Sequence, residues 1–301
     1  MIVRKWEGAS QYDSVAFAFR VIPHEGGIAL RVRGKVGPYT VTMRQTPTLL
    51  ETALQQDRRV TLFVLVAIPL AAWTWIVLMA RDMYGTMGGA SAWMMTTVWD
   101  WPHMLLLWVM WAVMMTAMML PTATPLILLY AAAARTNAEP GSPARRVYAL
   151  AAGYVLIWAL FSVLATALQR MLASALVLTP MMEPATPAAG AVVLAIAGLY
   201  QLTPLKRTCL RVCRSPLGFM VQRWRGGAAG AFRLGIDHGV HCLGCCWALM
   251  LILFAGGVMN LTIIITLTLW VLVEKIGPFG ERTSTASAVA LLAMAAWMGV
   301  R

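Results

Sequence analysis

The chain has 301 residues, of which 60% are hydrophobic and only 12% are charged, and its formal net charge is +12. This composition lies outside the range of soluble globular proteins and indicates a protein whose natural solvent is a lipid bilayer. The basic residues stand between apolar runs rather than in one stripe with interleaved aromatic residues, which excludes nucleic acid as the expected partner.

Residues 1–45 differ in pattern from the rest of the chain. They have neither the long apolar core of a signal peptide nor a strong helical period. We therefore predict a leader over 1–45 that is disordered or that results from a misassigned start. The remainder, 46–301, is predicted to be one transmembrane domain.

After position 49, long apolar stretches recur that could each cross a hydrocarbon core of about 30 Å as a helix. Backbone groups in lipid must be hydrogen-bonded within the segment, so each stretch is predicted to be helical. The expected fold is an all-α polytopic helix bundle of about seven spans. These lie roughly at 60–80, 104–130, 147–168, 188–205, 239–258, 259–275 and 284–300.

The basic residues between these spans predict the orientation. If the segment before the first span is cytoplasmic, most of the Lys and Arg residues between spans, including Lys206 and Lys275, lie inside. Only Arg81, Arg170 and Arg301 then lie outside, as the positive-inside rule requires. We expect a multi-pass protein of a bacterial inner membrane, with the basic loop 206–233 in the cytoplasm.

The segment 81–103, between the first two spans, is predicted to lie outside and is rich in methionine. It contains Met83, Met87, Met94 and Met95 and ends at His103. Such a segment could collect a soft metal in an oxidising compartment, where thiols would be lost to disulfides. Its tryptophans are also typical of an interfacial segment, which is the alternative interpretation.

The second predicted span carries rows of methionine and two prolines. Met110, Met114 and Met118 recur every four residues, beside the parallel pair Met115 and Met119, and Pro121 and Pro125 predict a helix kink. Thioethers suit copper(I), so these rows could pass the ion between weak neutral ligands. Adaptable core packing is the commoner use of methionine and the alternative interpretation.

The segment DHGVHCLGCCW, at 237–247, is the most specific signal in the chain. On one helix, residues three and four positions apart share a face, and Cys209 and Cys213 form a second pair at that spacing. Imidazole and thiolate ligands bind zinc and copper, and a set dominated by cysteine favours copper(I). The predicted metal ligands, with all five cysteines at the cytoplasmic end, are His238, His241, Cys242, Cys245, Cys246, Cys209 and Cys213. Burial of small thiols in the core is the alternative.

Four segments resemble a known family: WAVMMTAMMLPTATPLILLYA, QLTPLKRTCLRVCRSPLGF, GIDHGVHCLGCCWALMLILFAGGVMN and EKIGPFG. They are similar to a bacterial family of predicted metal-binding integral membrane proteins, a domain of unknown function, over about 57–299. The resemblance implies metal binding without naming the metal, a reaction or a direction. The residues that match its motifs are Met114, Met115, Met118, Met119, Pro121, Pro125, Cys209, Cys213, His238, Cys242, Cys245, Cys246, Asn260 and Glu274.

Three functions remain open, and no catalytic residue is assigned. The first is a membrane protein that binds copper(I), in preference to zinc, and transports it or delivers it to a metallochaperone or a membrane metalloenzyme. The second is a thiol oxidoreductase in which Cys242 and Cys245 exchange with Cys209 and Cys213. The third is a structural subunit with close helix contacts at small residues such as Gly235, which also allow a homo-oligomer.

Overall fold

The computed structural model describes residues 18–24, 27–34, 37–44, 63–85, 88, 90–95, 99–136, 142–179, 181–278 and 280–300, the first three stretches as backbone only. Contacts within the chain divide it into two units, Met1–Thr48 and Leu49–Arg301.

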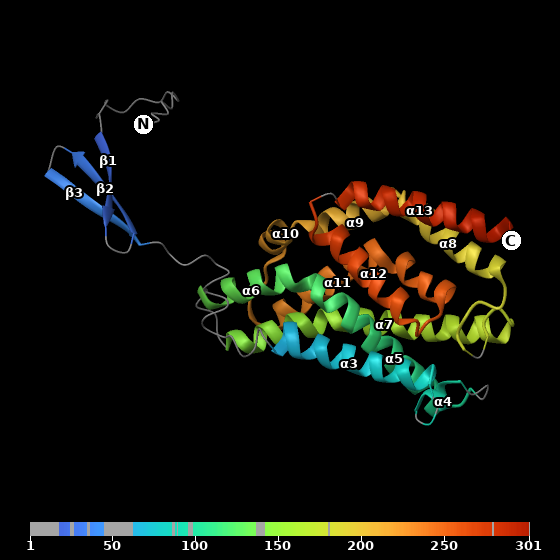
Figure 1. Ribbon diagram of the computed structural model, residues 1–301. Helices are drawn as coiled ribbons and strands as arrows, with labels where there is room; N and C mark the ends of the chain where they lie inside the picture. The colour runs from blue at the N-terminus through green and yellow to red at the C-terminus, as the bar shows by residue number, and fades with distance from the viewer. Residues whose placement is uncertain are drawn as a thin grey trace. The chain divides into compact units, whose positions relative to one another are not determined.

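The first unit contains a three-stranded antiparallel sheet, formed by β1 (Ala18–His24), β2 (Gly27–Gly34) and β3 (Gly37–Arg44) in that order (Figure 1). Its register pairs His24 with Gly27 and Gly34 with Gly37. The three strands lie within 1–45, where the sequence analysis predicted a leader and expected no strands. Short strands bounded by glycine have a period of two, which a search for helical periodicity overlooks. A misassigned start remains a prediction.

The second unit is helical, which confirms the predicted all-α fold. Its elements are η1 (Phe63–Ala67), α3 (Ile68–Met83), α4 (Ala90–Met94), α5 (Trp101–Met119), η2 (Leu120–Ala123), α6 (Thr124–Thr136), α7 (Pro143–Ser174), α8 (Pro187–Gln201), α9 (Pro204–Arg214), α10 (Pro216–Arg223), α11 (Gly227–Gly256), α12 (Leu261–Ile276) and α13 (Gly280–Val300). Helices α5, α7, α8, α9 and α12 each begin at a side chain that accepts a hydrogen bond from a first-turn backbone N–H. These caps are Asp100, Ser142, Thr186, Thr203 and Asn260.

Among the described residues, five helical segments are long and apolar enough to cross a membrane, and a sixth if the bent pair α8 and α9 counts as one. This is fewer than the predicted seven spans. Helix α12 occupies the sixth predicted position but has 16 residues, or about 24 Å, which is shorter than a hydrocarbon core. The chain also bends by 66° between α8 and α9, because Thr203 and Pro204 start a new helix there.

At the predicted kink, the α-helix is interrupted rather than smoothly curved. Pro121 lies in η2, a short 3₁₀ turn between α5 and α6, and Pro125 lies in the first turn of α6. A proline lacks the backbone N–H that would continue the helical ladder, so the change to a tighter turn follows from the sequence. This turn lies beside the cysteines of α11, as the contacts below show.

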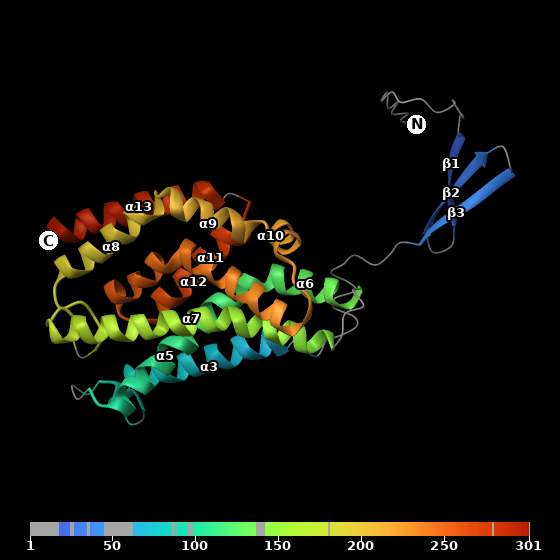
Figure 2. The ribbon, with the colours of Figure 1, turned by 180° about the vertical axis from the view of Figure 1, so that it is seen from behind.

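The core is centred on the contact between α7 and α11, with α3 and α5 on one side and α8, α9 and α13 on the other (Figure 1, Figure 2). Two glycines allow this contact. A Cβ atom on Gly235 would overlap the backbone oxygen of Leu150, and one on Gly153 would overlap that of Phe232. Small residues let helix backbones approach closely, so these glycines fix how α11 presents its cysteines to α7.

Candidate metal site

The predicted ligands on α11 lie in the middle of the helix and not at its start. Helix α11 begins at Gly227, so Cys242 is about four turns inside it. The predicted span began at 239 and placed these residues within its first two turns. The difference arises because the stretch before 239, expected to belong to a basic loop, continues the helix through the glycine contact with α7.

Sulfur atoms from three helices meet at this point. The Sγ atom of Cys213 on α9 is 4.0 Å from Sγ of Cys245 on α11, and Sγ of Cys246 is 3.9 Å from Sδ of Met119 on α5. Cys242, Cys245 and Cys246 are buried. We call Cys213, Cys242, Cys245, Cys246 and Met119 the sulfur cluster.

Cys242 also belongs to a buried polar network that the sequence analysis missed. The Lys275 ammonium donates to Sγ of Cys242 at 2.7 Å and to the Thr122 hydroxyl at 3.2 Å. The Tyr154 hydroxyl lies 2.9 Å from the same sulfur and donates to the backbone oxygen of Met119 at 2.8 Å. A buried cation is costly without partners, and Lys275 has these two hydrogen-bond acceptors and places its positive charge against the cluster.

The two histidines occupy different surroundings. His238 is buried, its ring lies against Tyr154 and Phe219, and its Nδ1 atom has no hydrogen-bond partner among the described residues. His241 is half-buried, and its Nδ1 lies 2.7 Å from the backbone oxygen of Asp237. A ring nitrogen needs a free lone pair to bind a metal. His238 therefore has an available Nδ1, whereas that of His241 is engaged within its own helix.

Cys209 lies beside the cluster rather than within it. A Cβ atom on Gly244 would be 2.7 Å from Sγ of Cys209, so this thiol packs against the glycine of the CLGCC segment. Cys209 is one turn from Cys213 on α9 and is partly exposed. Of the second predicted pair, the structure brings Cys213 to within van der Waals reach of an α11 thiol and leaves Cys209 at the edge.

Helix α9 is held in place by a buried ion pair. The Lys206 ammonium lies 2.6 Å from the Glu274 carboxylate on α12, which also accepts hydrogen bonds from Trp270 and Ser287. Arg214 donates to the backbone oxygen of Glu274 at 2.6 Å. Lys206 and Lys275, which the sequence analysis counted among the basic residues on the cytoplasmic side, are both buried. Sequence alone does not distinguish a basic residue that faces water from one that is paired inside a bundle.

The side chains at the sulfur cluster offer a few soft ligands rather than the four ligands of a closed metal site. Within the described part of the chain, no three His, Cys, Asp or Glu side chains are arranged to hold a metal ion. Two sulfur ligands, each about 2.3 Å from one ion, lie at most about 4.6 Å apart. The 4.0 Å between the Cys213 and Cys245 sulfurs lies within this limit.

The methionines of the predicted path are largely buried. Met110, Met114, Met115, Met118 and Met119 of α5 are inaccessible to solvent, Met83 and Met94 are also buried, and Met87 lies outside the described residues. The imidazole of His103 lies 3.2 Å from the backbone oxygen of Met94. His103 is 16 positions before Met119 on α5, which corresponds to about 24 Å along the helix axis.

The fold and the site define a class of helical protein with apolar helices long enough to span a bilayer and a buried group of sulfur atoms. Residues 108–298 match a protein family described as PpoB2, a copper chaperone. The chain belongs to this copper chaperone family, which confirms the predicted resemblance to a metal-binding family. No curated protein and no solved structure matches the chain.

Proposed function

We propose that the protein is a membrane-embedded copper(I) chaperone that holds the ion at the sulfur cluster and delivers it to a partner. The family match supports copper as the cargo, and the apolar helices support a bilayer environment. The observation that carries the proposal is the 4.0 Å approach of Cys213 and Cys245 from two different helices, beside the thioether of Met119.

The ligand types favour copper(I) over zinc. Thiolate and thioether groups are soft ligands that select copper(I), whereas structural zinc sites are closed by four Cys or His ligands. Two facing thiols with a neighbouring thioether offer a low coordination number instead. An ion held by few ligands leaves room for a partner's thiol to attack, which suits delivery.

The balance of charge at the cluster also favours copper(I) over zinc(II). Two thiolates and one copper(I) ion carry a net charge of −1, and the Lys275 ammonium against Cys242 brings the group to zero. With zinc(II) the same residues would carry a net charge of +1. An uncompensated charge in a buried site is costly, so the cluster is better matched to a monovalent ion.

The delivery partner is proposed to be a metallochaperone or a membrane metalloenzyme. We place the protein in a bacterial inner membrane with the segment before α3 in the cytoplasm, on the balance of basic residues. Three of the residues used in that balance are buried, namely Arg146, Lys206 and Lys275. The exposed basic residues of α9 and α10 still give the predicted cytoplasmic side the larger number of positive charges.

A second candidate function, thiol–disulfide exchange, is favoured by the same sulfur pair. Cys213 and Cys245 face each other across two helices, and a disulfide would require their sulfurs to close from 4.0 Å to about 2.05 Å. This pairing is one of those considered from the sequence, in which Cys242 and Cys245 exchange with Cys209 and Cys213. Its formation would require a disulfide of a partner as the oxidant.

The test is copper binding by the detergent-purified full chain under reducing, anaerobic conditions, with copper(I) supplied from a chromogenic chelator. The wild type should retain about one tightly bound copper per chain, and the Cys213→Ser, Cys245→Ser variant should lose it. Cys209→Ser is the matched control, because this thiol is on the same helix but outside the facing pair. Equal trace copper in all three proteins would contradict the proposal, and a reversible Cys213–Cys245 disulfide would then support thiol exchange.

A further inference from the structure

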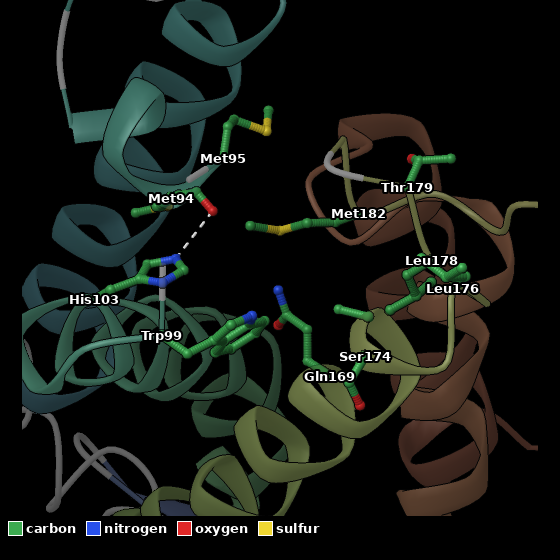
Figure 3. Close-up of a pocket in the computed structure, with 11 residues that line it drawn as sticks. Met94, Met95, Trp99, His103, Gln169, Ser174, Leu176, Leu178, Thr179 and Met182 are labelled. Carbon is green, nitrogen blue, oxygen red and sulfur yellow. Dashed lines mark hydrogen bonds between the residues drawn. The ribbon is translucent and has the colours of Figure 1, made fainter. Parts of the chain in front are cut away.

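A cavity of about 410 Å³ lies away from the sulfur cluster, where α4, the start of α5, the end of α7 and the loop before α8 meet. The residues that line it include Met94, Met95, Met182, His103 and Gln169 (Figure 3). In Figure 3, Met182 extends from its loop toward the imidazole of His103, and Gln169 points into the same space. Three methionines from two separate segments therefore line one cavity.

We propose that this cavity is a second site for copper(I), weaker than the sulfur cluster, in which the thioethers of Met94, Met95 and Met182 bind the ion as it enters or leaves the protein. This inference rests on the proposed function. It adds a location and a set of ligands. Two of the three methionines, Met94 and Met95, lie outside the family match, because the match begins at residue 108.

The chemistry of the lining selects a soft ion. None of the described residues that line the cavity is an Asp, Glu, Lys or Arg. Magnesium and calcium require oxygen ligands, usually carboxylates, so they have no suitable site here. Thioethers are neutral and soft, and they bind copper(I) without balancing its charge. Binding is therefore weaker than at thiolates, as an exchange site requires.

The backbone at Met182 is an independent observation. Met182 has a φ angle of +59°, in the left-handed region that a side chain with a Cβ atom rarely adopts. The loop holds it there through hydrogen bonds from Met182 N to the Thr179 oxygen and from Val258 N to the Met182 oxygen. A strained residue that its surroundings fix in place is a common feature of ligand sites. Met182 is also one of the residues that line the cavity.

His103 positions the other side of the cavity. Its Nε2 atom lies 3.2 Å from the backbone oxygen of Met94, and its ring packs against Trp99. These contacts hold the end of α4 against the start of α5. We assign His103 a positioning role and not that of a ligand.

One hydrogen bond joins the cavity lining to the helix that carries the buried methionines. Gln169 in its lining accepts a hydrogen bond of 2.7 Å from the indole of Trp111, which follows Met110 on α5. From there the inaccessible methionines continue to Met119, which contacts Cys246. An ion that leaves the neutral thioethers would move toward thiolates that bind it more tightly, so affinity alone could set the direction of loading.

The experiment is an anaerobic titration of the full chain with copper(I) against chelators of graded strength, which counts tight and weak ions separately. The wild type should bind one tight and one weak ion. The Met94→Leu, Met182→Leu variant should keep the tight ion and lose at least tenfold in affinity for the weak one. Leucine conserves volume, so the fold should survive. Met220→Leu, Met298→Leu is the control, because neither residue lines the cavity.

The outcomes separate the two proposals. A weak ion that persists in Cys213→Ser, Cys245→Ser and disappears in the Met94→Leu, Met182→Leu variant would support the second site. One tight ion in the wild type with no weak ion, or a weak ion that the leucine variant retains, would overturn it while the proposed function stands. A wild type that binds no copper(I) at all would instead overturn the proposed function and this inference together.

Discussion

Lys275 and Cys242 are 33 positions apart in the chain, yet the ammonium of one lies 2.7 Å from the sulfur of the other, and Lys275 is buried. The contact joins α12 to α11 at the proposed copper site. It gives Lys275 a testable role, because a fixed positive charge beside a thiolate lowers the electrostatic cost of a copper(I) dithiolate.

Replacing Lys275 by Met removes that charge and conserves much of the volume. We expect affinity for copper(I) to fall at least tenfold, because the bound group would carry an uncompensated charge of −1. The free energy of unfolding should change by less than about 2 kcal/mol, since an apolar substitute for a buried ion is often tolerated. Chelator competition and denaturation in detergent check the two values, and Lys275→Arg should rescue part of the affinity. Unchanged affinity in Lys275→Met would remove the residue from the site.

The Lys206–Glu274 ion pair should matter for stability more than for copper chemistry. Lys206→Met leaves a buried carboxylate without its cation and should destabilise the protein by about 3–5 kcal/mol. The double variant Lys206→Met, Glu274→Leu removes both charges and should recover most of that loss. Denaturation midpoints of the wild type, the single variant and the double variant provide the measurement. A single variant as stable as the wild type would show that α9 is held by other contacts.

Gly235 is predicted to be essential for the α7–α11 contact. A Cβ atom there would overlap the backbone oxygen of Leu150, which a small rotamer change cannot relieve. Gly235→Ala should therefore cost about 1–3 kcal/mol. It should also weaken copper binding, because α11 shifts relative to Tyr154. Gly299→Ala, with no atom within 4 Å of the added Cβ, is the control and should gain the helix propensity of alanine, up to about 1 kcal/mol. Thermal unfolding compares them, and equal midpoints would contradict the close contact.

The sequence predicted the helices well where a capping residue, a proline and an apolar run coincide, as at Ser142 and Thr186. It predicted α11 poorly, because the glycines that continue this helix resemble a loop until α7 is placed beside them. The predicted number of spans, about seven, exceeds the five or six helical segments of sufficient length among the described residues for a similar reason. An apolar run shows hydrophobicity, but whether α12 needs to reach across a bilayer depends on its neighbours.

The candidate site was predictable in its residue types and not in its contacts. The spacing of His238, Cys242 and Cys245 indicated one helix face, which the structure has. The approach of Cys213 to Cys245 depends on the 66° bend between α8 and α9, which directs α9 back along α11. Lys275 and Tyr154 carried no local signal, since each reaches Cys242 only through tertiary packing.

Met119 distinguishes a metal path from ordinary core packing, the two interpretations of the methionine rows. Its Sδ atom is 3.9 Å from Sγ of Cys246, and it is the point where α5 meets the sulfur cluster. Met119→Leu conserves volume and should change the free energy of unfolding by less than about 1.5 kcal/mol. If the thioether hands copper(I) to the thiols, loading of the tight site should slow about tenfold or more while its stoichiometry is unchanged. Stopped-flow loading from a copper(I)–chelator complex measures this rate.

Met250→Leu is the matched control for that rate, because Met250 is equally buried on α11 and does not belong to the cluster. Packing alone predicts that both variants load at the wild-type rate, since leucine fills the same space without a sulfur ligand. A slower rate in both would indicate a general change in the dynamics of the bundle. Both substitutions remove a thioether, but only the sulfur of Met119 belongs to the sulfur cluster. A defect confined to Met119→Leu therefore assigns that sulfur a part in transfer.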